Sequence, residues 1–175
     1  MNEATTVGWY PIRVTYKREM KLKTYLDSAG ISNFLPMRYK EVVESRKLIL
    51  APAIHNLIFI QSTRKVIDEL KPEVEAEAPM RYIIDKTTNR PIVVPERQME
   101  NFIAVAGTYN EQLVYLARIE PTLKKGERVR VTGGIFSGVE GVVVRIKRDQ
   151  RVLVSIEGII AVATAFIHPL LLEKI

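Results

Sequence analysis

The sequence predicts an α+β fold in two parts, a larger N-terminal domain of strands and helices and a small C-terminal β barrel. Two observations lead to this prediction. Strand-like alternation and helical spacing follow one another up to residue 107. Beyond residue 122 the chain changes to short β runs separated by glycines, as in RVRVTGGIFSGVEGVVVRIKRD. A chain of 175 residues has room for one mid-sized domain and one minimal domain. We therefore expect domains over 1–107 and 123–175, joined by a linker over 108–122.

The composition is that of a globular protein. Hydrophobic residues make up 47% of the chain and charged residues 26%, which allows a packed core. The absence of cysteine excludes disulfides, thiolate zinc sites and cysteine nucleophiles, and fits a reducing cytoplasm. No apolar run approaches the ~20 residues of a membrane span, and the N-terminus lacks the pattern of a signal peptide. We therefore expect a cytoplasmic protein without a membrane anchor.

The net charge of +6 is unevenly distributed. Between Gly126 and Arg151 there are six arginines and lysines but only three acidic residues. A basic excess of this kind attracts polyanions, so nucleic acid or an acidic protein surface is a plausible partner. A merely solubilising surface is an equal alternative on charge alone.

The first elements follow a strand and helix order. Residues 9–16 alternate with a period of two, which predicts a strand, and Pro11 suggests an edge strand or an early position in the ladder. Residues 17–29 carry Leu22 and Leu26 at helical spacing and stop at Gly30, which predicts a helix with a glycine after its last turn.

The middle of the chain predicts two hairpins and two helices. Residues 33–61 contain two extended runs around the polar ESR, followed by a strand buried on both faces at residues 57–60. Ser62 or Thr63 is expected to cap a short helix that ends before Pro72 and turns Val66 and Leu70 inward. RYII and PIVV flank the polar turn DKTTNR as a second hairpin. Pro95 then opens a helix whose apolar stripe comprises Met99, Phe102, Ile103 and Ala106.

The C-terminal part contains five short β runs: RVRV, VVVRIK, RVLVSI, AVATAF and LLLEKI. Five strands in about fifty residues suit a small closed barrel, because closure removes exposed strand edges. Val129 and Val131 alternate with Arg128 and Arg130, so one face packs and the other is basic. The cluster TGGIFSGVEG lacks the Lys-Ser/Thr ending of a phosphate loop and precedes a strand. Its glycines are therefore expected to permit positive φ angles and a tight turn.

No catalytic constellation is evident in the sequence. His55 and His168 fall in different predicted domains without metal-ligand spacing, and a lone histidine in an apolar strand is usually structural. No Ser-His-Asp set is apparent, although a triad assembled in space stays open. We expect no enzyme activity, no metal and no cofactor.

The residues resemble a known family. The stretch KGERVRVTGGIFSGVEGVVVRI at residues 125–146 resembles the KOW motif of the NusG/Spt5 transcription elongation factors. The strand WYPIRV, the helix after it, the hairpin before NLIFIQ and the segment PIVVPERQMENF resemble the NGN domain of the same family. The resemblance implies an antiparallel NGN sheet flanked by helices and an SH3-like KOW barrel. Within the family the chain is most similar to the specialised UpxY-like antiterminators of polysaccharide operons.

The resemblance implies a factor that binds the clamp helices of RNA polymerase through the NGN domain and disfavours pausing. By position, the implied polymerase-binding residues are Arg13, Ile54, Leu57, Phe59 and Tyr82. For the apolar ones, a plain core role is an equal alternative. The turn usually reads Pro-Gly-Tyr or Pro-Asn-Tyr in the family, whereas this chain has Ile54, His55, Asn56 and Leu57 there.

Further partners are implied by position. Arg64 and Lys65 are candidates for contacts with the non-template DNA strand, although they need no function as an ordinary helix-start surface, which is the favoured alternative. In the barrel, Ile135 and an exposed Phe136 are the implied docking point for a ribosomal protein or a termination factor. A general NusG-like elongation factor and a ribosome-associated KOW protein that binds RNA remain alternative functions. We expect a monomer.

The sequence also bears on the conformation of the C-terminal domain, since some relatives hold it as a helical hairpin that masks the polymerase site. Residues 129–156 are dominated by valine and isoleucine, which favour strands. Gly133, Gly134, Gly138 and Gly141 would each weaken a helix by roughly 1 kcal/mol relative to alanine. We therefore expect a constitutive β barrel on a flexible linker, with the NGN site open.

Overall fold

The computed structural model describes residues 2–119, 123 and 126–175. The end of the expected linker, residues 120–122, and two residues near the start of the expected C-terminal domain, Lys124 and Lys125, lie outside the described residues. The chain divides into two compact units. Unit 1 comprises Met1–Pro36 and Pro52–Glu96, and unit 2 comprises Met37–Ala51 and Arg97–Ile175.

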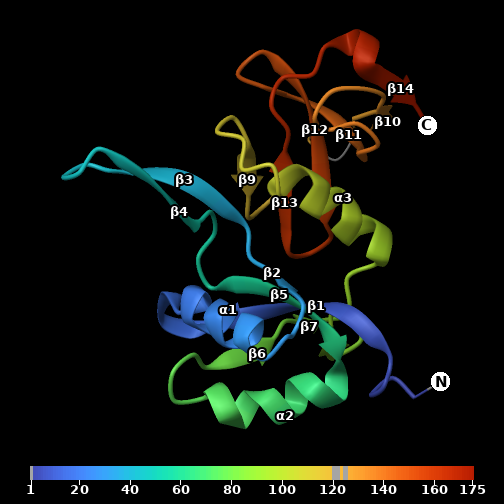
Figure 1. Cartoon of the computed structure of the whole chain (residues 1–175). Coiled ribbons are helices and arrows are strands. Elements are labelled where there is room, and N and C mark those ends of the chain that lie inside the picture. The colour runs from blue at the N-terminus through green and yellow to red at the C-terminus, as the bar shows by residue number, and fades with distance from the viewer. Residues whose placement is uncertain (1, 120–122, 124–125) are drawn as a thin grey trace. The chain divides into compact units, whose positions relative to one another are not determined.

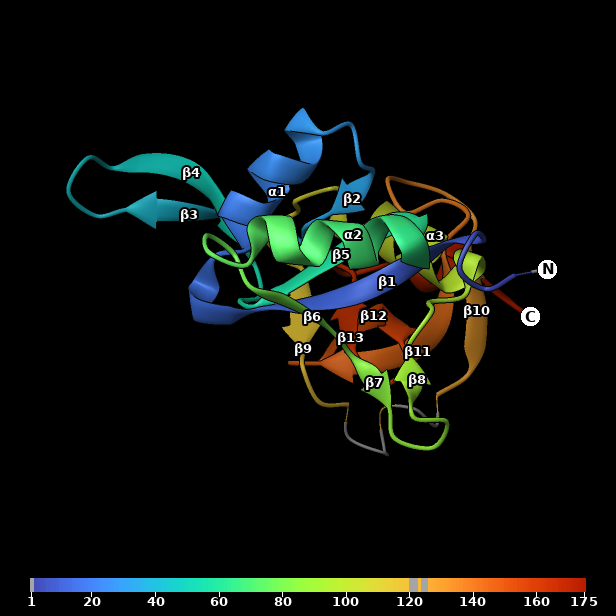
Figure 2. The same ribbon diagram turned by 90° about the horizontal axis from the view of Figure 1, so that it is seen from below.

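Unit 1 is built on a four-stranded antiparallel sheet with strand order β2-β5-β1-β6. Two helices pack beside this sheet, α1 against β2 and β5, and α2 against β5 and β6 (Figure 1). In the view of Figure 2, α2 crosses in front of β5. A short hairpin of β7 and β8 follows β6. The elements are β1 (Val7–Val14), a 3-10 turn (Thr15–Lys17), α1 (Glu19–Ser28), β2 (Asn33–Phe34), β5 (Leu57–Thr63), α2 (Arg64–Val74), β6 (Met80–Tyr82), β7 (Ile84–Asp85) and β8 (Arg90–Pro91).

The first helix forms as the sequence predicts, but the first strand covers residues 7–14 instead of 9–16. It also lies inside the sheet, between β5 and β6, so the suggested edge position was wrong. Ile12 and Val14 of β1 are fully buried, and the helix α1 buries Leu22 and Leu26 on its sheet-facing side. Gly30 follows the helix with a φ of 68°, a conformation that a residue without Cβ adopts without strain. The strand β5 is buried on both faces over residues 57–60, which confirms that prediction.

Helix α2 differs from the expectation in its end and in its buried face. The hydroxyl of Thr63 accepts a hydrogen bond from the Val66 backbone N–H at 3.2 Å, so the predicted cap is confirmed. The helix continues through Pro72 to Val74, because a proline in the last turn removes only one backbone bond and the buried Val74 keeps that turn packed. Ile67 and Leu70 face inward, whereas Val66 is 36% exposed. The prediction for Val66 was therefore wrong.

Unit 2 contains a two-stranded hairpin, the helix α3 and a six-stranded antiparallel sheet of order β14-β10-β11-β12-β13-β9. Five of these strands are the predicted β runs, and the C-terminal segment forms strands rather than helices. The sixth, β9, pairs with β13 and lies in the segment expected to be a linker. The elements are β3 (Met37–Val42), β4 (Lys47–Pro52), α3 (Glu96–Ala106), β9 (Val114–Leu116), β10 (Arg128–Val131), β11 (Glu140–Ile146), β12 (Asp149–Ile156), β13 (Ile160–Ala163), a 3-10 turn (Pro169–Leu171) and β14 (Leu172–Lys174).

The glycines of the β10–β11 connection act as the sequence predicts. Gly134 has a φ of 77° and Gly138 a φ of 87°. At Gly141, a Cβ atom would lie 2.4 Å from the backbone oxygen of Leu153, so this strand can approach its neighbour only without a side chain. On β10, Val129 and Val131 are buried, and their neighbours Arg128 and Arg130 are exposed.

Arg151 is a buried cation that joins two parts of unit 2. Its guanidinium donates hydrogen bonds to the backbone carbonyls of Gln112 and Thr164 and lies 3.5 Å from a carboxylate oxygen of Asp149. A buried arginine is retained only when such partners compensate its charge. The bond to Gln112 holds the segment before β9 against the sheet, which the basic pattern of the sequence did not indicate.

Tyr115 in β9 allows a prediction about alkaline stability. Its hydroxyl is buried and has no hydrogen-bond partner among the described residues, and burial raises its pKa from 10.0 to about 12. The folded chain therefore holds this proton more tightly than the unfolded chain does. That contribution to stability is complete below pH 10.0 and is lost as the pH rises toward 12. Tyr115→Phe should leave the free energy of unfolding at neutral pH unchanged or raise it by about 1 kcal/mol.

The same substitution should reduce the loss of stability between neutral pH and about pH 11, as measured by urea unfolding at several pH values. Tyr16→Phe is the matched control, because Tyr16 is 78% exposed. Equal alkaline losses in both variants would contradict the assignment to Tyr115.

Candidate functional site

The structure divides the predicted polymerase-binding residues between the two faces of the unit 1 sheet. Residues directly opposite in antiparallel strands share a face. Arg13 lies opposite Leu57 and Arg81, so these side chains share one face, and Phe59 is on that face too. Tyr82 lies opposite Ile12 and therefore belongs to the other face.

Burial separates the apolar candidates from the surface. Leu57 is 7% exposed and Phe59 is fully buried, so both lie in the core, the alternative that the sequence left open. Ile54 is half-buried and Arg13 is exposed. Arg13 and Ile54 are therefore the members of the predicted set that reach the surface around the start of β5.

The turn before β5 is held by a buried carboxylate. Glu19, the first residue of α1, is 1% exposed, and its Oε1 lies 2.9 Å from Nδ1 of His55. Its other oxygen accepts a hydrogen bond from the Asn56 backbone N–H at 3.3 Å. Asn56 has a φ of 65°, and its side-chain oxygen accepts from the Lys17 backbone N–H at 2.9 Å. The turn before β5 is thus tied to the start of α1.

A second cluster forms around Tyr82 on the opposite face. Its hydroxyl donates to Asp68 at 2.8 Å, while Lys71 Nζ lies 3.8 Å and Arg64 Cζ 5.9 Å from its ring centroid. Such cation–π contacts stabilise a cation over the ring face. Burial, and then the bond to Asp68, raise the pKa of Tyr82 above its usual range, so the phenol stays protonated near neutral pH. The structure thus brings Tyr82 together with Arg64 rather than with Arg13.

Of the two predicted nucleic-acid contacts, Lys65 is the more exposed. Its side chain is exposed at the start of α2, and its backbone N–H donates to the carbonyl of Ala4 at 3.1 Å. Arg64 is partly buried against Tyr82, and its Nε is 3.9 Å from Asp68. The charge of Lys65 is therefore more accessible to a ligand than the charge of Arg64.

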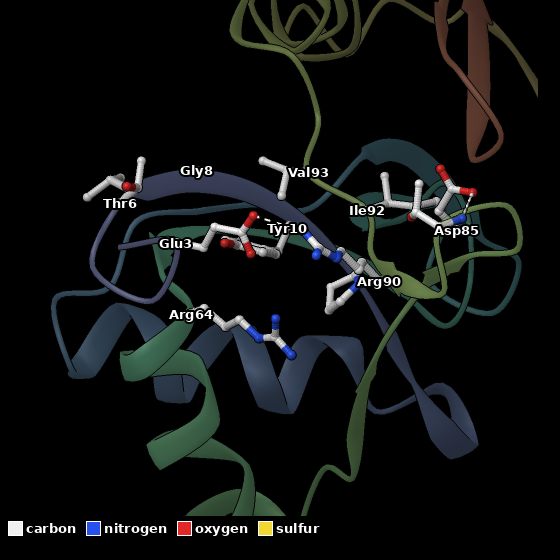
Figure 3. A pocket seen from close by; sticks show the side chains of 12 residues that line it. Glu3, Thr6, Gly8, Tyr10, Arg64, Asp85, Arg90, Ile92 and Val93 are labelled. Atoms are coloured by element: carbon white, nitrogen blue, oxygen red, sulfur yellow. Dashed lines mark hydrogen bonds and ion pairs between the residues drawn. The ribbon is translucent and has the colours of Figure 1, made fainter. Parts of the chain in front are cut away.

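A cavity of about 570 Å³ opens beside the first residues of β1. Its wall combines the N-terminal turn, β1, the start of α2 and the β7–β8 hairpin. Figure 3 shows Glu3, Tyr10, Arg64 and Arg90 directed into this space, with Val93 at its border. Because these residues come from four distant segments, no motif in the sequence pointed to the cavity.

The predicted docking loop of unit 2 is only partly exposed. Ile135 is 67% exposed, but Phe136 is 5% exposed, so the expectation of an exposed phenylalanine was wrong. The loop is a tight turn, closed by the Gly138 N–H donating to Val131 O at 2.8 Å and the Val139 N–H donating to Phe136 O at 3.1 Å. This turn keeps Phe136 close to the buried Val131 and Val139.

The hairpin of β3 and β4 carries exposed apolar side chains that the sequence did not single out. Val43 is 86% exposed and Leu48 is 60% exposed, and Tyr39 and Ile49 are also on the surface. Neighbouring exposed apolar side chains often mark an interaction surface. Periodicity could not reveal them, because the hairpin reads as an ordinary pair of strands.

In the part of the chain that the structure describes, no group of three histidine, aspartate or glutamate side chains is placed to hold a metal ion. No described helix is long and apolar enough to cross a membrane.

Comparisons with known proteins identify two regions. The family model described as transcription termination factor nusG matches residues 8–103, more than half of the chain, and the KOW motif matches residues 125–157. A solved structure described as "Domain interaction in Thermotoga maritima NusG" is similar over 97% of this chain and 98% of that chain, with 20% identity and a TM-score of 0.50. At that identity the likeness bears on the fold alone. None of the curated proteins matches significantly.

The buried carboxylate of Glu19 allows a test of the turn before β5. Glu19→Ala should lower the free energy of unfolding by about 1 to 3 kcal/mol, because the Asn56 N–H loses its acceptor in a buried place. Urea unfolding of the full chain measures this change. Glu69→Ala, which removes an exposed carboxylate from α2, should change it by less than about 0.5 kcal/mol. Similar effects of the two substitutions would show that Glu19 does not fix the turn.

Proposed function

Since the chain belongs to the NusG family of transcription factors, we propose that it is an elongation and antitermination factor that binds the RNA polymerase clamp. The observation that carries the proposal is the match of residues 8–103, together with a KOW motif after it in the same chain. The domain division proposed for this function is an NGN domain over 1–107, a linker over 108–122 and a KOW domain over 123–175.

The polymerase surface proposed on unit 1 follows from exposure. Arg13 and Ile54 supply its accessible side chains, and Leu57 and Phe59 support it from the core. The contact between Glu19 and His55 keeps the Ile54 turn in a fixed position. A pre-organised surface binds with a smaller entropic cost than a flexible one. The exposed apolar residues of the β3–β4 hairpin are a further surface for the same partner.

The factor is proposed to act by binding alone, as a cytoplasmic monomer without catalysis or a cofactor. A clamp-bound protein that bridges the polymerase cleft disfavours pausing without making or breaking a bond. Arg64 and Lys65 are the proposed contacts with the non-template strand. The Ile135 turn of unit 2, shaped by the buried Phe136, is the proposed contact for a ribosomal protein or a termination factor.

The proposed subgroup is the UpxY-like antiterminators that act on polysaccharide operons. The similarity of the whole chain to these specialised paralogues supports it. A general NusG-like elongation factor shares the same two domains, so the neighbouring genes are the observation that separates the two. The KOW motif and the net charge of +6 also favour a second candidate, a ribosome-associated protein that binds RNA.

Polymerase binding is the first test of the proposal. The full chain should retain purified RNA polymerase in a pull-down and should not enrich ribosomal RNA. Arg13→Glu should weaken polymerase binding about tenfold or more, since a reversed charge at an interface costs several kcal/mol. Arg148→Glu, in the exposed β11–β12 turn, is the control and should bind as the unsubstituted chain does. Retention of ribosomal RNA without polymerase would instead support the second candidate.

Salt dependence tests the proposed contact of α2 with DNA. Lys65→Glu should weaken binding to elongation complexes more at low salt than at high salt. The slope of log affinity against log salt should fall by about 1 for each lost phosphate contact. Titrations of assembled complexes over a range of potassium chloride measure this slope. An equal loss of affinity at all salt concentrations would indicate a packing role for Lys65.

A further inference from the structure

The cavity beside β1 has an apolar wall and a polar side, on which Arg64 and Arg90 lie together with the carboxylates of Glu3 and Asp85. Val93 and Ile92 contribute to the apolar wall, and Gly8 contributes no side chain. A Cβ at Gly8 would lie 2.9 Å from Cγ1 of Val93, so the wall is already closely packed there. Cavities of this size with an apolar lining and a few convergent polar groups are typical of small-ligand sites.

Two guanidinium groups reach the cavity from different elements. Arg90 of β8 donates to Oε1 of Glu3 at 3.0 Å, and these side chains are 68% and 73% exposed. An exposed ion pair contributes about 0 to 1 kcal/mol, so an anion can replace Glu3 at small cost. Arg64 enters from the start of α2, where its nearest carboxylate, Asp68, is 3.9 Å from Nε. Both arginines are therefore accessible to an anionic group placed between them (Figure 3).

Tyr10 adds a neutral donor to the lining of the cavity. Its side chain is 5% exposed and its ring lies 5.7 Å from that of Tyr82, so its position is fixed by packing. Burial raises the pKa of Tyr10, and the nearby charge of Arg64 partly opposes this. The hydroxyl is thus protonated near neutral pH and able to donate a hydrogen bond into the cavity.

We propose that this cavity binds a nucleotide, with the phosphate between Arg64 and Arg90 and the base against the wall formed by Gly8, Ile92 and Val93. Arginine is the side chain best suited to phosphate, because its planar fork donates two parallel hydrogen bonds. A nucleobase is flat and largely apolar on its faces, and its polar edge meets the carboxylate of Glu3 and the hydroxyl of Tyr10.

Other anions fit the same wall less well. A sugar phosphate would place hydroxyl groups against Ile92 and Val93 without partners, which costs free energy for each buried polar group. A fatty acid would leave most of its chain outside a cavity of about 570 Å³ that also holds two arginines. The combination of a flat apolar body and a phosphate satisfies both halves of the site.

The nucleotide has two possible sources, a free nucleotide or one unit of a single strand. Only the second source rests on the proposed function, which brings the start of α2 and Lys65 to single-stranded DNA. In that case, phosphates on either side of the bound unit would add contacts with exposed cations such as Lys65. The recognition chemistry inside the cavity is the same in both cases.

The test uses the isotope-labelled full chain and NMR titration of the Gly8, Tyr10, Ile92 and Val93 amides. Titration with dAMP should produce saturable shifts at these residues. Deoxyadenosine and inorganic phosphate should each bind at least about tenfold more weakly, because each supplies only half of the contacts. A short deoxyadenosine oligonucleotide that binds about tenfold more tightly than dAMP identifies the strand as the source, and equal binding identifies the free nucleotide.

Substitutions in and near the cavity test whether the ligand binds there. Arg90→Gln should weaken dAMP binding by about tenfold, and Val93→Trp, at a position 51% exposed in the free chain, should abolish it by filling the cavity. Lys86→Gln removes an exposed charge from the same hairpin outside the cavity and should change the affinity by less than about twofold. Unchanged spectra away from the site confirm that each variant is folded.

Three results would overturn the inference: no saturable shift at these residues with any nucleotide, equal binding of phosphate and dAMP, or unchanged dAMP binding in Val93→Trp. A polymerase pull-down with the same samples distinguishes a failure of the nucleotide site from a failure of the proposed function. Loss of nucleotide binding in a chain that retains polymerase overturns only the nucleotide site, whereas an unsubstituted chain that does not bind polymerase overturns the proposed function.

Discussion

The antiparallel pairing of β1 with β5 is the constraint on which unit 1 depends. Seven residue pairs join the two strands, from Val7 opposite Thr63 to Arg13 opposite Leu57. The register places Ile12 opposite Ile58, and both are fully buried. Full burial of such side chains contributes roughly 1.5 to 3 kcal/mol each. A slip by one residue would turn these side chains to the other face, so the pairing also decides which residues reach the surface.

Both candidate surfaces of unit 1 lie at the ends of this strand pair. At the end of β1, the carboxylate of Glu19 fixes the turn that leads into β5, beside Arg13. At its start, Gly8 and Tyr10 form part of the cavity with Arg64 and Arg90. The rigid central pair therefore holds two sites of different chemistry, and the residues at each site come from elements that only the sheet brings together.

Unit 2, built on a six-stranded sheet, is also held by two contacts of a different kind. Gly141 lets β11 approach β12 without a side chain, and the buried Arg151 bonds to backbone carbonyls on two segments. The first contact requires a glycine, and the second requires an arginine whose charge is compensated by backbone carbonyls. The exposed Arg128 and Arg130 on the same strand as the buried valines leave one basic face for partners.

The sequence by itself determined the element order, the five C-terminal strands and the family, because strand and helix periods, caps and glycine turns are local patterns. It missed the strand β9, since three residues show no period, and it misjudged Val66 and Phe136, whose burial depends on neighbours distant in sequence. The sequence predicted a buried strand at residues 57–60 but also offered Leu57 and Phe59 as surface contacts, and the tertiary structure decided for the core. Only the tertiary structure showed that Glu19 is a buried partner of His55 and that Arg64 faces Tyr82. Burial and side-chain contacts between segments are set by sheet register and packing, and neither is encoded in the spacing of residues along a single segment.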